Sequence, residues 1–348
     1  MVEEGWLISQ VHPTLDLTIY NYSQKTQYES WWNEHTLMCR GLVLNSKGKI
    51  VARPFSKFFN WEEVKDKVPV DESYEVYEKM DGSLGIFFWY ADDATELLHP
   101  VFASRGSFTS EQAAKGWQML QKLPYHDLAY GHTHLFEIIY PSNRIVVDYG
   151  AEERLVLLSI ISTQDGVEIP RMDIEVHLGD LFELVKVYHY PKNWSQLKSS
   201  IEPNKEGFVV RFSSGFRMKI KFEEYVRLHR ILTQVSNIDI WECMMQSKPL
   251  THILDRVPDE FYSWVRDWEN AISFAYAAKD LDAQNLFNRL CEEAPPTRKE
   301  QALWIQSNAP QKYHSILFNK LDGKSFSQMI WKMIRPERKK PFWQKREN

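Results

Sequence analysis

The chain has 348 residues, of which 43% are hydrophobic and 14% aromatic, enough to form the cores of two domains of ordinary size. A formal net charge of −5 excludes a general attraction to phosphate, so nucleic acid would need a local basic surface, and three distant cysteines argue against a disulfide framework or a zinc site. With no leader-like start and no apolar run of about 18 residues, we expect a soluble cytoplasmic protein with no membrane partner.

Up to about residue 222, the predicted elements are mostly strands and turns. Residues 40–55, RGLVLNSKGKIVARPF, contain two β-rich runs around residues 45–48 and predict a hairpin. Residues 74–90 predict a strand, a turn at Asp81-Gly82 and a very apolar strand. Residues 110–123 predict a helix that begins at Ser110. Further strands are predicted in the segments THLFEIIY, RLVLLSII, GFVVRF and FRMKIKF.

After about residue 222 the pattern becomes helical. Apolar residues share one helical face in the segment FYSWVRDWENAISFAYAAK, namely Phe261, Trp264, Val265, Trp268 and Ile272. Their main role is interpreted as core packing between helices. We therefore predict an α+β domain of antiparallel sheets with helices over residues 1–225 and a smaller all-α domain over residues 226–348. The basic tail that contains Arg335, Arg338, Lys339 and Lys340 is either solvated or in contact with nucleic-acid phosphates.

Lys79 is the first candidate for chemistry, because it lies among apolar residues and directly before the turn at Asp81-Gly82. A lysine amine becomes a nucleophile when burial or neighbouring cations lower its pKa. The turn would set the direction of the side chain. The pattern Lys-x-Asp-Gly is short, however, and is weak evidence by itself.

Four more charged residues follow in order along the chain. Glu137 lies inside an apolar strand and Glu206 precedes a glycine and another apolar strand. Lys219 and Lys221 alternate with apolar residues, so both are predicted on one face of a strand. Two lysines on one face repel each other unless water or an anion such as phosphate lies between them.

Taken together, these segments resemble motifs I, III, IV and V of the covalent lysine nucleotidyltransferases, the superfamily of ATP-dependent ligases and mRNA capping enzymes. The motifs are Lys79-Met80-Asp81-Gly82, Phe136-Glu137-Ile138-Ile139, Glu206-Gly207-Phe208-Val209 and Lys219-Ile220-Lys221. The segments CRGLVLNSKGKIVARPFSKFFNW and SRGSF are similar to parts of the RNA ligase 1 family of T-even phages. The resemblance covers roughly residues 35–230 and implies a nucleotidyltransferase (ATP-grasp-like ligase) domain. The helical part matches the family in type only.

The resemblance implies an ATP-dependent RNA ligase that joins 5′-phosphate and 3′-hydroxyl ends. Lys79 would attack the α-phosphorus of ATP, the AMP would pass to the RNA 5′-phosphate, and the 3′-hydroxyl would then displace AMP. Such reactions depend on positioning and charge stabilisation, so Mg²⁺ or Mn²⁺ is expected at the phosphates. Lys219 and Lys221 would hold the α-phosphate, while Arg40 and Lys57 would hold the β- and γ-phosphates.

The remaining roles also come from the resemblance. Phe59, Arg105, Met80, Asp81 and Gly82 complete the expected nucleotide-binding set. The carboxylates of Glu137 and Glu206 suit a metal ion, water or ribose. The adenine is expected between Val209 and either Phe136 or Ile138. Outside these motifs, His132 and His134 form a His-x-His pair without an evident third metal ligand.

Other functions remain open at this point. A DNA ligase or a GTP-dependent capping guanylyltransferase would normally carry an OB-fold after motif V, which the helical pattern disfavours. A non-catalytic RNA-binding relative is disfavoured because the nucleophile, both acids and both motif V lysines are present. The expected partner is an RNA with broken ends, with a cleaved tRNA as the candidate substrate in RNA repair, and the chain is expected to act as a monomer.

Overall fold

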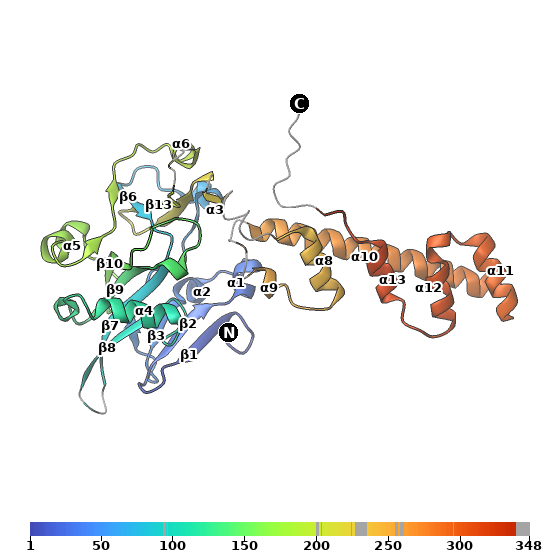
Figure 1. Ribbon diagram of the computed structural model, residues 1–348, viewed down its shortest axis with the longest axis horizontal. Helices are drawn as coiled ribbons and strands as arrows, with labels where there is room; N and C mark the ends of the chain where they lie inside the picture. Colours follow the sequence, from blue (N-terminus) through green and yellow to red (C-terminus); the bar gives the residue numbers. More distant parts are fainter. Residues whose placement is uncertain are drawn as a thin grey trace. The chain divides into compact units, whose positions relative to one another are not determined.

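The computed structural model describes residues 1–92, 95, 97–199, 202, 204–223, 225–226, 235–254, 257, 261–294 and 296–338. The chain divides into two compact units, Met1–His229 and Arg230–Asn348, which are described separately below. The first is a mixed α+β unit and the second is helical in its described part (Figure 1). The predicted fold class is therefore confirmed. Within the described residues, none of the helices is both long and apolar enough to cross a membrane.

A four-stranded antiparallel sheet begins the first unit. Its strands, in spatial order, are β1 (Leu7–Val11), β2 (Thr18–Tyr22), β3 (Arg40–Leu44) and β4 (Ile50–Ala52). The predicted hairpin around residues 45–48 is confirmed, and Gly48 occupies the turn at a φ of 75°, where a side chain would be strained. Two short helices, α1 (Gln24–Tyr28) and α2 (Glu34–Met38), connect β2 to β3.

A five-stranded sheet follows, and we call it the β9 sheet. Its strands, in spatial order, are β11 (Glu183–Leu184), β10 (Arg154–Ser162), β9 (His132–Ile139), β7 (Ser83–Ala91) and β8 (Leu98–Ser104). Helices α4 (Glu111–Leu120) and α5 (Arg171–Leu178) cover one face over a buried apolar cluster (Figure 1). As predicted, α4 begins after Ser110, whose hydroxyl accepts a hydrogen bond from the Ala113 N–H.

The second five-stranded sheet carries motifs I, IV and V, and we call it the β13 sheet. Its strands, in spatial order, are β12 (Val187–Tyr188), β6 (Tyr74–Lys79), β13 (Gly207–Phe212), β14 (Arg217–Lys221) and β5 (Phe59–Asn60). Its pairs are antiparallel except β14–β5. In the β9 sheet the pair β10–β11 is likewise parallel, so each sheet departs from the predicted antiparallel pattern only at a two-residue edge strand.

The two faces of the β13 sheet have opposite character. Val76, Phe208, Val210, Met218 and Ile220 point into an apolar core on one face. The residues between them form the other face, so the prediction that the motif V lysines alternate with Met218 and Ile220 is confirmed. A smaller apolar cluster on that face connects the two five-stranded sheets, and its members are Tyr77, Met80, Ile139, Val156 and Val185.

Short helices connect these sheets. They are α3 (Trp61–Val64), α6 (Trp194–Ser199) and the 3₁₀ helices Lys65–Lys67, Tyr125–Asp127 and Pro141–Asn143. The last of these begins the loop that supports the motif I turn.

The described part of the second unit is formed by helices. They are α8 (Asn237–Met245), α9 (Thr251–Leu254), α10 (Tyr262–Glu293), α11 (Arg298–Asn308), α12 (Gln311–Leu321) and α13 (Ser327–Met333). On the predicted apolar face of α10, Phe261, Val265 and Ile272 are buried, while Trp264 and Trp268 are half-buried. The packing prediction for this face is thus confirmed. Of the basic tail, Lys339 and Lys340 lie outside the described residues.

Candidate active site

Lys79 ends β6, and Asp81 anchors the turn that follows it. The Asp81 carboxylate is only 3% exposed. Its Oδ2 accepts hydrogen bonds from the N–H groups of Val146 and Val147 at 2.9 and 2.8 Å, and its Oδ1 accepts one from the Tyr225 hydroxyl at 2.7 Å. A buried carboxylate with three donors holds its position firmly. Asp81 therefore holds the backbone around the turn that follows Lys79, and each of its two carboxylate oxygens accepts a hydrogen bond.

The ammonium of Lys79 meets a carboxylate that a second lysine also contacts. Lys79 Nζ lies 2.7 Å from Glu206 Oε2, and Lys221 Nζ lies 3.4 Å from Glu206 Oε1. The sheet register explains this grouping, because Gly207 pairs with Lys79 on one side and with Lys221 on the other. Gly207 has a φ of 149°, and a Cβ there would lie 2.0 Å from the Ile220 carbonyl oxygen. Only glycine fits between these two strands.

Glu137 reaches the same region from the β9 sheet. Its Oε1 accepts a hydrogen bond from the Gly82 N–H at 2.9 Å. A Cβ on Gly82 would lie 2.5 Å from the Ile138 carbonyl oxygen, so the close approach of the two strands requires glycine. Burial raises the pKa of Glu137 to about 7; the nearby Lys79 opposes this shift and Glu206 adds to it. The site thus holds two carboxyl groups, of which Glu137 titrates near neutrality.

The cations expected at the outer phosphates gather around one tyrosine, Tyr22, at the end of β2. Lys57 Nζ lies 5.4 Å from the centre of the Tyr22 ring, and the Arg105 guanidinium lies 5.7 Å from it. Tyr22 also contacts Arg40, whose pKa is lowered by burial and by Arg105 while Tyr22 and Glu137 oppose the shift. The Nη1 atom of Arg40 is buried and has no hydrogen-bond partner among the described residues. Lys57, Arg105 and Arg40 therefore all lie near the Tyr22 ring. The buried Nη1 atom of Arg40 is a candidate donor to an anion.

Aromatic rings surround the ammonium of Lys57. The rings of Trp32 and Phe59 lie 5.3 and 5.4 Å from Lys57 Nζ, beside that of Tyr22. Phe59 is on β5, which pairs with β14 so that Asn60 lies opposite Lys219. Phe59 is thus one of the three aromatic residues whose rings surround Lys57 Nζ.

Phe136 and Ile138, one of which was expected beside adenine, lie on the face of β9 opposite Glu137. Phe136 is fully buried in the cluster under α4, and Ile138 lies in the same cluster. Both therefore point to the face of β9 opposite Glu137, because side chains alternate along a strand. The expected contact of Phe136 or Ile138 with adenine stays a prediction, and both side chains lie in the core beneath α4. Met80 is also buried, between the two sheets.

Val209 and Lys219 do lie on the site face. They are paired in the register of β13 and β14. Lys219 is only 8% exposed, and Val209 is half-buried beside the cluster between the sheets. An apolar surface and a buried cation thus adjoin the Lys79–Glu206 contact.

The described side chains offer few candidate ligands for a metal ion. Within the described residues, no three side chains of His, Cys, Asp or Glu cluster as a metal site. His134 is buried, and burial together with His132 lowers its pKa to about 3. His134 therefore packs in the core while His132 is half-buried, and Glu137 and Glu206 remain the acids beside Lys79.

Three tyrosines of the site were not predicted from the sequence. Tyr22 lies 18 residues before Arg40, Tyr149 accepts the Asp81 N–H at 2.9 Å, and Tyr225 donates to the Asp81 carboxylate. Each lies outside a charged motif, and tyrosine in a β-rich chain is common. Only Tyr225 could have been suspected from the sequence, because it follows motif V residue Lys221 by four residues.

Comparison with known proteins relates the chain to RNA ligases. The RNA ligase family of the T4 RNA ligase 1 type matches residues 38–226, more than half of the chain. The chain is 23% identical over 323 residues to the RNA ligase of Rhodothermus phage RM378, and the match covers 70% of each protein. A solved structure of a Naegleria gruberi RNA ligase with PPi is 17% identical, with a TM-score of 0.42 over 50% of this chain and 57% of that one.

A further relative is a protein of Autographa californica nuclear polyhedrosis virus whose name joins polynucleotide kinase and RNA ligase. It is 26% identical over 248 residues, which are 64% of this chain but 35% of the viral protein. The chain thus spans about a third of the length of that relative. The matched residues of the family include every motif from Arg40 to Lys221. The chain belongs to the RNA ligase family.

Proposed function

We propose that the chain is an ATP-dependent RNA ligase and that Lys79 is its nucleophile. The observation that carries the proposal is that Lys79 and Lys221 both contact the buried carboxylate of Glu206. Glu137 and the cations Arg40, Lys57 and Arg105 lie in the same region. Buried charges are costly, so a group of them marks a site with a polar ligand. ATP is a substrate of the proposed reaction, and the unpartnered Nη1 of Arg40 fits an anionic group near Tyr22.

In the first step, the Lys79 amine loses a proton to solvent and forms an N–P bond to the α-phosphorus while the bond to pyrophosphate breaks. The Lys79–Glu206 contact of 2.7 Å shows which group faces the amine before ATP arrives. Lys219 and Lys221 would stabilise the charge that develops on the α-phosphate. Arg40, Lys57 and Arg105 would bind the leaving pyrophosphate.

In the second and third steps, AMP moves to the RNA and is then released. An oxygen of the RNA 5′-phosphate displaces Lys79 from the AMP phosphorus, which regenerates the amine and activates the end. The 3′-hydroxyl then loses its proton, attacks the activated 5′-phosphorus and displaces AMP. The same cations would support each step, because all three are displacements at phosphorus.

Mg²⁺ or Mn²⁺ fits the carboxylates of Glu137 and Glu206, which are hard oxygen ligands. Such an ion would neutralise phosphate charge when bound. Because the described residues offer no three-ligand cluster, phosphate oxygens would have to complete its coordination.

We assign substrate selection to the helical unit, with an RNA that has broken ends, such as a cleaved tRNA, as the substrate in RNA repair. Exposed cations there, among them Lys299, Lys324 and Arg338, are suited to phosphate contacts. We further propose that the chain acts as a monomer.

The test is incubation of the purified protein with α-labelled ATP or GTP and Mg²⁺. We expect label on the protein from ATP only. Label from GTP would instead favour a capping enzyme, and no label from either would favour a binding protein. A panel of nicked and broken RNA and DNA substrates then separates an RNA ligase from a DNA ligase.

A further inference from the structure

A second, partly buried network of charges lies on the same face of the β13 sheet as Lys79, at the other end of the strands. In the register of the sheet, Glu75 of β6 lies opposite Arg211 of β13, and Arg211 lies opposite Arg217 of β14. Two arginines directly opposite each other on neighbouring strands repel unless an anion lies between them. The Glu75 carboxylate contacts Arg211 Nη1 at 3.1 Å, but Arg217 needs another partner.

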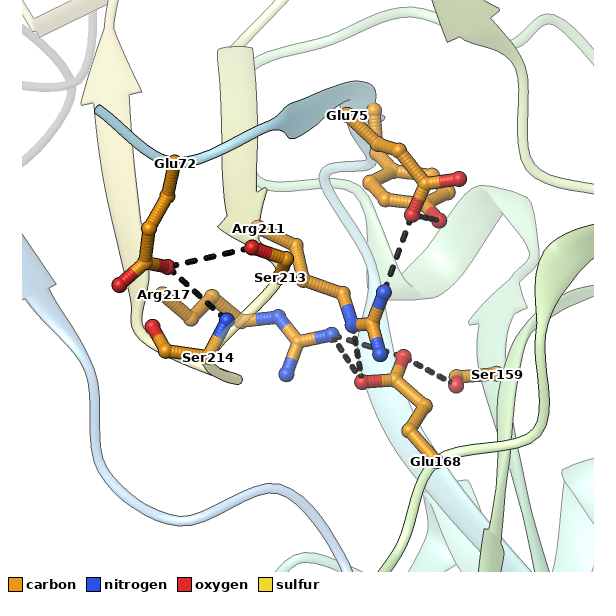
Figure 2. A network of polar contacts seen from close by, with 9 residues as sticks. Glu72, Glu75, Ser159, Glu168, Arg211, Ser213, Ser214 and Arg217 are labelled. Carbon is orange, nitrogen blue, oxygen red and sulfur yellow. Dashed lines mark hydrogen bonds and ion pairs between the residues drawn. The ribbon is translucent and has the colours of Figure 1, made fainter. Parts of the chain in front are cut away.

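That partner is Glu168, which belongs to the opposite sheet. Its backbone pairs with Ile161 of β10. Its carboxylate accepts hydrogen bonds from Ser159 at 2.5 Å, from Arg211 Nε at 2.7 Å and from Arg217 Nη2 at 2.8 and 2.9 Å (Figure 2). One side chain therefore joins β10 to both β13 and β14.

The network is balanced, and its Glu168–Arg217 part is largely shielded from water. Two carboxylates face two guanidiniums; the side chains of Glu168 and Arg217 are 13% and 12% exposed, whereas those of Glu75 and Arg211 are 37% and 20% exposed. Burial alone would raise the pKa of Glu168, but Arg217, Ser159 and Arg211 lower it below its ordinary value. The carboxylate is thus charged at neutral pH. Loss of one carboxylate would leave a buried cation unbalanced.

Strands β6, β13 and β14 of the candidate active site are each attached to this network. Arg217 lies two residues before Lys219 on β14, and its guanidinium stacks on Phe55 at 4.1 Å from the ring centre. Tyr77 lies two residues before Lys79 on β6 and donates a hydrogen bond to Glu75 at 2.8 Å. A shift of the network would therefore move the strands that carry the lysines.

We propose that Glu168 is a positioning residue for adenylyl transfer. It fixes β13 and β14 against the β9 sheet, so that Lys219 and Lys221 face the phosphorus attacked by Lys79. It acts through Arg211 and Arg217 and does not touch the substrate. This inference rests on the proposed function of Lys79.

The test compares Glu168→Gln, Arg217→Gln and the double variant with Glu183→Gln. Glu183 is a matched control, because its carboxylate forms a 2.8 Å ion pair with Arg154 elsewhere on the β9 sheet. Thermal midpoints are measured first. The single-turnover rate of labelling by α-labelled ATP is then measured at saturating ATP, well below every midpoint.

We expect Glu168→Gln and Arg217→Gln each to slow labelling by about tenfold or more, because small misplacements of catalytic groups are costly. The double variant should be no slower than either single variant, since the two residues act as one unit. Glu183→Gln should stay within about twofold of the wild type. A lowered midpoint with an unchanged rate at saturation, or losses that multiply in the double variant, would overturn the proposal.

Arg217→Lys keeps the test decisive if the glutamine variants do not fold. It retains the charge but loses the planar guanidinium whose Nη2 donates to both carboxylate oxygens of Glu168. We expect it to fold and to label more slowly than the wild type at saturating ATP; a wild-type rate would overturn the proposal. A wild-type protein that takes no label from ATP would contradict the proposed function itself rather than the role of Glu168.

Discussion

The two units of the chain differ in where they keep their charges. The first unit buries Asp81, Glu206 and Lys219, whereas the buried polar side chains described from residue 235 onward, Ser236 and Asn237, are uncharged. A buried charge needs partners that compensate for lost water. The first unit supplies such partners from two sheets, and the second packs its helices with apolar side chains.

Charges of the helical unit lie near its surface, often beside aromatic rings. Lys320 Nζ lies 5.2 and 4.8 Å from the rings of Phe287 and Phe326, and the Arg298 guanidinium lies 5.4 Å from that of Phe318. Cations placed in this way can attract phosphate but are not arranged around a reacting group. This difference supports the proposal that the first unit carries the chemistry and the second selects the substrate.

The largest effect is expected from removing the proposed nucleophile of the first unit. Lys79→Ala should abolish labelling of the protein by ATP yet leave sealing of a pre-adenylylated RNA at least partly active, because the amine is needed only to form the activated end. Lys67→Ala, which changes an exposed lysine of the same unit, serves as the control. A stable protein–AMP adduct on the Lys79→Ala variant would show that another residue is the nucleophile.

Substitutions on the two faces of β14 separate an effect on the reaction rate from an effect on stability. Lys219→Ala and Lys221→Ala should each slow labelling by about 100-fold while the fold is retained, the usual effect of losing one group that stabilises transition-state charge. Met218→Ala on the opposite, fully buried face should instead cost about 2–5 kcal/mol of unfolding free energy. Rates and urea unfolding are measured on all three variants. Normal turnover in both lysine variants would indicate a merely solvated face.

Removal of residues 236–348 tests the role assigned to the helical unit. Labelling of Lys79 by ATP should remain measurable, because the motifs end at Lys221. Sealing of structured RNA should fall about tenfold more than sealing of plain single strands, and the loss should shrink as salt rises, since phosphate contacts are screened. A soluble truncated protein that labels normally and keeps the wild-type ratio would rule out substrate selection by the helices.

The last expected effect is on stability alone and concerns Glu137. Its pKa is raised from 4.5 to about 7, so between these values the folded protein keeps a proton that the unfolded chain loses. The resulting stability is fully present below pH 4.5 and is lost as the pH rises through about 7. Glu137→Gln should therefore gain about 2 kcal/mol relative to the wild type between pH 5 and pH 8. Thermal unfolding across this range would contradict the assignment if the difference stayed constant.

Much of the fold followed from local patterns. The hairpin at residues 45–48, the helix after Ser110 and the alternation of Lys219 and Lys221 with apolar residues were all predicted, because each depends on neighbours in the chain. The direction of the Phe136 ring, by contrast, did not follow from the motif. The motif names the residue, but the pleat of β9 turns its ring into the core under α4.

The sequence by itself determined the order of the charged motifs and the strand faces on which the motif V lysines lie, since period-two alternation is a local property. Only the tertiary structure decided that Gly207 pairs between Lys79 and Lys221, that Tyr22 gathers three cations, and that Glu168 joins two sheets. These contacts connect residues from tens of positions to more than 100 positions apart. Their geometry depends on strand order and register, which no short segment of the chain encodes.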